Sequence, residues 1–228
     1  MKRIITSPVV TALLFVLAAG LIGFGGVNTA QAALTINSRD FGAQVQLASI
    51  NTSLVETNAG GSRVVAAEGV EVPLVEGTLV PDGEKFQIGK KYQEELTVSN
   101  DGAIDEFVRV TVYKYWVDAE GNPIKKTDLD PKLIELEFDT SKWTIDTEAS
   151  TEERTVLYYQ GTLAAGDETA PLTKSIKISP VTLGKVATGK YSYEGVEFQL
   201  KAVVDAVQTH NGNDAMVGAW GQTYSQVG

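Results

Sequence analysis

Few residues in this chain could carry out catalysis. His210 is the only histidine and cysteine is absent, so thiol catalysis and cysteine–zinc sites are excluded. Neither the nucleophile motif G-x-S-x-G nor the zinc-peptidase motif H-E-x-x-H occurs. A catalytic zinc normally needs more nitrogen ligands than one histidine supplies. We therefore expect His210 to lie in a loop and the protein not to be an enzyme.

A group of oxygen-bearing side chains near the C-terminus could bind a hard cation. Its members, all within ten positions, are Asp205, Asn211, Asn213 and Asp214. Calcium prefers such ligands, but the spacing matches neither an EF-hand loop nor a repeat-type calcium motif. The same residue types also form caps and turns. The sequence favours caps and turns, with no cofactor, and leaves calcium as the alternative.

An aromatic cluster and the abundant carboxylates each have two interpretations. Tyr113, Tyr115 and Trp116 could form a platform for carbohydrate, or they could pack in the core and across strands. Two of the many Asp and Glu side chains could form the acid pair of a glycoside hydrolase. An acidic, solvated surface explains most of these carboxylates.

The clearest strand pattern lies at Ile104–Val117, which is rich in β-branched and aromatic residues. Val108, Val110 and Val112 fall on one face, which we predict to be the core face. Residues 193–207 alternate in the same way, and we expect at least two of Val196, Phe198, Leu200 and Ala202 to be buried. Further strands are expected at Gln44–Leu47, Tyr92–Ser99, Leu133–Phe138, Trp143–Asp146, Thr155–Gln160 and Thr173–Ile178.

These strands predict an all-β fold, an antiparallel sandwich of jelly-roll type. Residues 57–84 are rich in turn-forming residues, so short edge strands and loops are expected there. One helical turn is expected at Asn213–Trp220, ended by Gly221. We expect Trp220 to be largely buried and to anchor this turn.

The N-terminus reads as a signal sequence over residues 1–32. Lys2 and Arg3 precede the apolar run VVTALLFVLAAGLIGFGGV, and Ala30-Gln31-Ala32 is a small-x-small cleavage pattern. A retained membrane anchor is the alternative, because the run approaches the length of a spanning helix. We expect cleavage after Ala32, secretion to the cell surface or medium, and one domain over residues 33–228.

The formal net charge of the whole chain is −10, and cleavage would remove two basic residues. Such a chain repels nucleic acid and anionic membranes. We therefore expect neither as a partner after cleavage. A signal peptidase is the expected partner during export.

Three blocks together resemble a known group of proteins. They are GKKYQEELTVSNDGAIDEFVRVTVYKYWVD (89–118), LIELEFDTSKWTIDTEASTEERTVLYY (133–159) and LKAVVDAVQTHNGNDAMVGAWG (200–221). With the signal end GLIGFGGVNTAQAAL, they look like uncharacterised exported proteins of Gram-positive Firmicutes. More distantly, the chain resembles the TasA/camelysin family, which is exported through a specialised signal peptidase.

The resemblance implies a jelly-roll protein of the biofilm matrix whose subunits assemble into fibres by exchanging N-terminal strands. The segment Ala33, Leu34, Thr35 and Ile36 would then be the exchanged strand, because its apolar residues alternate with polar ones. The same segment could instead pair within its own sheet. The expected partners are other copies of the chain or other matrix and surface proteins. An extracellular carbohydrate- or calcium-binding module is the alternative, and a metallopeptidase-like enzyme is the least favoured reading.

Overall fold

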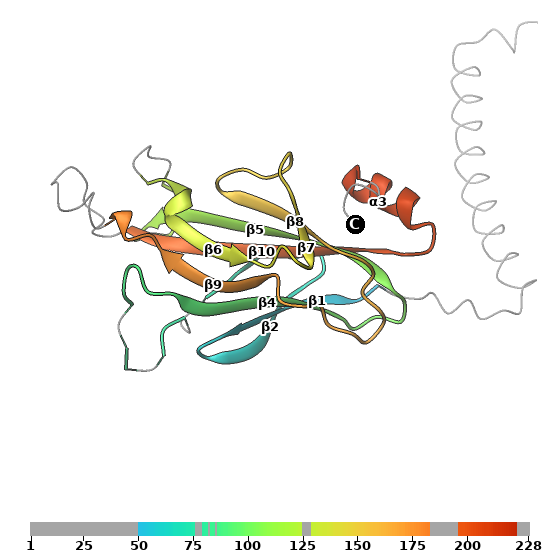
Figure 1. Cartoon of the computed structure of the whole chain (residues 1–228), viewed down its shortest axis with the longest axis horizontal. Coiled ribbons are helices and arrows are strands. Elements are labelled where there is room, and N and C mark those ends of the chain that lie inside the picture. The colour runs from blue at the N-terminus through green and yellow to red at the C-terminus, as the bar shows by residue number, and fades with distance from the viewer. Residues whose placement is uncertain are drawn as a thin grey trace, which may run out of the picture. The chain divides into compact units, whose positions relative to one another are not determined.

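The computed structural model describes residues 50–75, 79–81, 83–84, 86–124, 129–182 and 196–222. The expected signal sequence, the segment Ala33–Ile36 and the expected strand Gln44–Leu47 lie outside these residues. The described residues form two antiparallel five-stranded sheets and a short C-terminal helix (Figure 1). The predicted antiparallel sandwich is confirmed.

Sheet 1 has the strand order β2-β1-β4-β9-β6. Its strands are β1 (Thr52–Asn58), β2 (Gly61–Ala67), β4 (Tyr92–Asn100), β9 (Thr173–Ile178) and β6 (Ile134–Phe138), the last preceded by a 3-10 turn, η1 (Pro131–Leu133). Thr169 and Thr173 extend the contact between β4 and the chain around β9, because their hydroxyls accept the backbone N–H groups of Val98 and Leu96, each at 3.0 Å. Side chains therefore complete hydrogen bonds that a backbone ladder would otherwise supply.

Sheet 2 has the strand order β3-β10-β5-β8-β7. Its strands are β3 (Val72–Pro73), β10 (Val196–Gln208), β5 (Glu106–Asp118), β8 (Arg154–Tyr159) and β7 (Trp143–Asp146). β5 and β10 pair along their full length. Successive strands alternate between the sheets from β4 to β6 and from β8 to β10, which is the crossing pattern of a jelly roll.

The core lies between the two sheets, and the predicted inward residues of both long strands reach it. Val108, Val110 and Val112 are buried, as are Leu200 and Ala202, so both predictions of core residues are confirmed. Period-2 alternation explains this result, because alternate side chains of a strand point to the same face.

Most of the predicted strands are observed at or near their predicted positions. β7 and β9 match their predicted ranges at both ends, and β4, β5, β6 and β8 differ from theirs by one or two residues at either end. β1 was not predicted. The inward-facing residues of β1 are Thr52, Leu54, Glu56 and Asn58, so the strand lacks the apolar alternation that marks a buried face.

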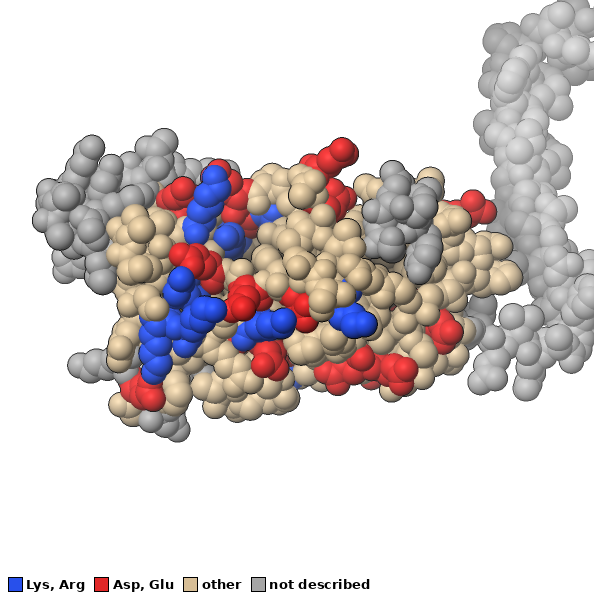
Figure 2. Space-filling model, in the orientation of Figure 1, with Lys and Arg blue, Asp and Glu red and all other residues tan. Residues whose placement is uncertain are grey.

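Charged side chains on and beside the strands of sheet 1 form pairs of opposite charge. Lys91 Nζ lies 2.7 Å from Glu137 Oε2, and Lys177 Nζ lies 2.6 Å from Glu135 Oε2. On the face shown in Figure 2, lysine and arginine side chains lie beside acidic ones. Exposed pairs of this kind contribute at most about 1 kcal/mol each, so they add little to the stability of the fold.

The predicted C-terminal helix is present as α3 (Gly212–Trp220), and Gly221 ends it in a left-handed conformation, as expected. The prediction that Trp220 is largely buried needs correction. Met216 is the fully buried side chain of the helix, while Trp220 is only half-buried against Tyr158. None of the described helices is long and apolar enough to span a membrane.

Candidate functional site

The structure does not bring the calcium candidates together as one ligand set. Asp205 lies on β10 and is held by Arg109, whose Nε and Nη2 donate to Asp205 Oδ2 at 3.2 and 2.9 Å. Asn211 precedes α3 with φ of 51°, and Asp214 lies in the first turn of that helix. Asn213 is exposed on α3. Among the described residues, no three or more His, Cys, Asp or Glu side chains are arranged to hold a metal ion.

The proposed aromatic platform is divided between two faces of β5. Trp116 points inward and is buried, and its Nε1 donates to the carbonyl of Asp130 at 3.1 Å. Tyr113 and Tyr115 lie on the opposite face, and Tyr115 Oη bonds to Gln199. A three-residue platform is therefore not formed, because odd- and even-numbered residues of a strand face opposite ways. His210 lies exposed in the turn before α3.

Three glutamates that no sequence pattern indicated are fully buried: Glu56, Glu94 and Glu106. Glu56 lies on the inner face of β1. Its Oε1 accepts the backbone N–H of Val75 at 2.6 Å, and its Oε2 lies 2.5 Å from Arg63 Nη2. Val75 itself has φ of 55°, a strained value for a β-branched residue. Glu56 thus connects β1, β2 and the chain after β3.

Glu94 lies on the inner face of β4, directly opposite Asn58 of β1. Burial, and next the charge of Glu56, raise the pKa of Glu94 to about 9. Glu94 is therefore protonated at neutral pH, while the carboxylate of Glu56 contacts Arg63 and the Val75 N–H group. The two carboxyl groups form a buried pair.

Glu106 opens β5 at the other end of β1. Its Oε2 accepts the hydroxyl of Thr52 at 2.7 Å, and burial raises its pKa. None of the three glutamates has exposed surface. A glycoside hydrolase needs its acid pair open to substrate and water, so the Glu56–Glu94 pair does not fit that role. These residues act on stability and on its pH dependence.

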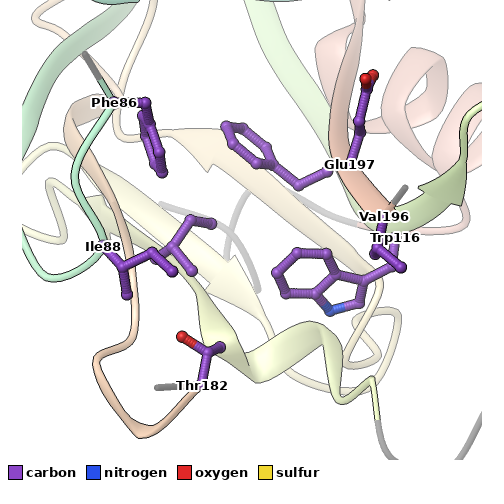
Figure 3. A pocket seen from close by; sticks show the side chains of 8 residues that line it. Phe86, Ile88, Trp116, Thr182, Val196 and Glu197 are labelled. Atoms are coloured by element: carbon purple, nitrogen blue, oxygen red, sulfur yellow. The ribbon is translucent and has the colours of Figure 1, made fainter. Parts of the chain in front are cut away.

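An apolar hollow of about 400 Å³ opens at one end of the sandwich. The residues around it are mainly large and apolar: Phe86, Ile88, Trp116, Ile178, Val196 and Phe198. Figure 3 shows Phe86, Ile88, Trp116 and Val196 around one shared space. Phe86 and Ile88 remain 38% and 39% exposed. Their apolar-x-apolar spacing within a turn-rich stretch was the sequence signal that could have indicated them.

In the part of the chain that the structure describes, the backbone of β10 beside this hollow has a partner strand on one side only. Among the described residues, β3 is the strand that flanks β10 opposite β5, and it pairs only with Lys201 and Ala202. The Leu200 carbonyl accepts from Leu74 on that side at 3.0 Å. Because the backbone of a strand repeats every two residues, the N–H and C=O groups of Phe198 and Val196 point to the same side of β10 as the Leu200 carbonyl. Within the described ranges, β10 therefore has an edge without a strand partner next to an apolar hollow.

Comparisons of this chain with protein-family models, with curated proteins and with solved structures return no match.

Proposed function

We propose that this chain is a secreted structural protein of the cell surface or biofilm matrix that assembles into fibres. In this proposal Ala33–Ile36 of one copy adds as a strand to another copy. The observation that supports it most directly is the unpaired edge of β10 beside the hollow. An edge strand and an exposed apolar surface are the two features that strand addition uses.

The chemistry of the donor segment matches this acceptor. An added strand bonds through its backbone to the edge of the sheet, while alternate side chains enter the adjoining groove. Leu34 and Ile36 are two residues apart, so both would point to the same side. Phe198 and Val196 on β10 have the same spacing and line the hollow. Two apolar side chains would thus cover surface that is now partly open to water.

Electron microscopy of the purified protein that begins at Ala33 tests the proposal. We expect fibres from this form and folded monomers after deletion of residues 33–38. Phe198→Lys should also prevent fibres, because it places a charge in the hollow. Val64→Lys is the matched control: Val64 is 67% exposed on the edge strand β2, and this variant should assemble normally.

Two results would contradict the proposal. One is equal assembly of the full and truncated proteins, and the other is no assembly by either form. Circular dichroism of every variant separates a failure to assemble from a failure to fold.

A further inference from the structure

A second hollow, of about 250 Å³, lies against sheet 2 beside α3. Its lining includes Arg109 and Tyr113 of β5, Arg154 and Tyr158 of β8, Asp146 of β7 and Trp220 of α3. An adjoining hollow of about 230 Å³ shares Asp146 and Tyr158 with it. Together they form one extended groove, which we call the α3 groove. Trp116 and Tyr115 are not part of it.

The polar side chains of the α3 groove are held in place by bonds within the protein. Nε and Nη2 of Arg154 donate to the carbonyl of Ala149 at 3.0 and 2.6 Å. Asp146 Oδ1 accepts the backbone N–H groups of Glu148 and Ala149 at 3.0 and 2.8 Å. Groups fixed in this way lose little conformational freedom when a ligand binds.

Charged groups of both signs line the α3 groove. Arg109 and Arg154 lie in its lining together with Asp146 and Glu148, and Arg109 is also paired with Asp205 at 2.9 Å. The two cations are therefore balanced by carboxylates, and the whole chain is acidic. An anionic polymer would meet no excess of positive charge here. A purely apolar ligand would leave the arginines and Asp146 without the water that now solvates them.

Aromatic rings lie among these charged groups. The ring centre of Trp220 is 5.6 Å from that of Tyr158 and 5.2 Å from the guanidinium carbon of Arg109. Tyr113 is half-buried on the same wall. A sugar ring has an apolar face of C–H groups and a rim of hydroxyls that both donate and accept hydrogen bonds. Aromatic rings with fixed arginine and carboxylate groups suit both features.

We propose that the α3 groove binds a neutral oligosaccharide. Tyr113 and Trp220 would contact the apolar face of a sugar ring, while Arg154 and Asp146 would bond to its hydroxyls. This site is separate from the hollow beside β10, so either proposal can fail without the other.

Calorimetric titration of the intact protein from Ala33 with chitohexaose, cellohexaose, maltohexaose and mannohexaose tests this site. We expect saturable binding of at least one of them. Its Kd should rise at least tenfold in Tyr113→Ala and in Arg154→Ala. Tyr115→Ala is the matched control, because Tyr115 is on the same face of β5 but outside the groove lining. Its Kd should not change.

Tryptophan fluorescence gives a second readout, because Trp116 and Trp143 are buried and Trp220 is the partly exposed one. The oligosaccharide that binds should shift the emission of the wild type and leave that of Trp220→Phe unchanged. The proposal is overturned if none of the four oligosaccharides shows saturable binding, or if Tyr113→Ala and Arg154→Ala bind the oligosaccharide as tightly as the wild type does. Preferential binding of hexagalacturonate, an anionic probe, would also overturn it.

Discussion

The carboxyl groups of Glu94 and Glu56 are buried together between the sheets, on neighbouring strands of the same sheet. Burial of Glu94, and then the nearby charge of Glu56, are what raise the pKa of Glu94 to about 9. This pair sits beside Arg63 at the β2 edge. The pH dependence of folding should therefore be set in large part within sheet 1.

Glu94→Gln should stabilise the protein at neutral and alkaline pH. The pKa of Glu94 is raised from its ordinary 4.5. The stability that the protonated side chain contributes is therefore fully present below pH 4.5 and is lost as the pH rises to about 9. Between these limits the unfolded chain releases a proton that the folded chain keeps, which lowers stability by up to about 1.4 kcal/mol per pH unit. A neutral amide removes this loss.

Thermal melting from pH 4.5 to 9 measures the effect of Glu94→Gln. We expect a flatter profile and a Tm several degrees above that of the wild type at pH 8, with little difference at pH 4.5. Glu95→Gln, on the outer face of the same strand, is the control and should keep the wild-type slope. An unchanged slope in Glu94→Gln would show that Glu94 is ionised in the folded protein.

Arg63→Met should destabilise the protein more than the double variant Glu56→Gln/Arg63→Met. Removing Arg63 alone leaves the buried charge of Glu56 without its cation, and breaking a buried pair costs about 3–5 kcal/mol. Because Arg63 is partly exposed, water will replace some of the lost interaction, and we expect about 2 kcal/mol. Urea unfolding of both single variants and the double variant gives the coupling energy. Additive effects would mean that the pair does not interact.

Met216→Ala should weaken the docking of α3. Met216 is fully buried, and removing such a side chain costs about 2–5 kcal/mol. Val217 follows it in the helix and is 50% exposed, so Val217→Ala should change the free energy of unfolding by less than about 0.5 kcal/mol. Equal effects of the two substitutions in chemical denaturation would contradict the assigned orientation of the helix.

Two glycines of α3 should respond oppositely to alanine. A Cβ at Gly212 would overlap the ring of Phe107, whereas a Cβ at Gly218 meets no atom within 4 Å. Gly212→Ala should therefore cost about 1–3 kcal/mol through overpacking. Gly218→Ala should stabilise the protein by up to about 1 kcal/mol, because alanine favours helix. Thermal unfolding of the two variants tests these opposite effects. Stabilisation by both substitutions would mean that Phe107 moves aside freely.

The sandwich could be predicted because its two longest strands alternate strongly. Val108, Val110 and Val112 mark the inner face of β5, and Leu200 and Ala202 mark that of β10. α3 was predictable for a local reason, since Gly221 ends the helix with a positive φ. In these segments local propensity and final packing agree.

The buried glutamates could not be predicted, because their environment depends on distant parts of the chain. Glu56 meets Val75 and Arg63 only once β1, β2 and the chain after β3 have come together. In sequence, these residues read as an acidic surface. The edge of β10 beside the hollow could not be predicted for the same reason, since it depends on how short β3 is.

The pairing of β5 with β10 also governs when this chain can fold. Val110 of β5 pairs with Val204, far along the chain, and β10 is the last strand of the described residues to be synthesised. Until it emerges, β5 lacks its partner strand on one side and the inner face of β1 lacks its contacts with β10. Contacts so distant in sequence form slowly. We therefore expect the core to close late in synthesis, once β10 is available to pair with β5.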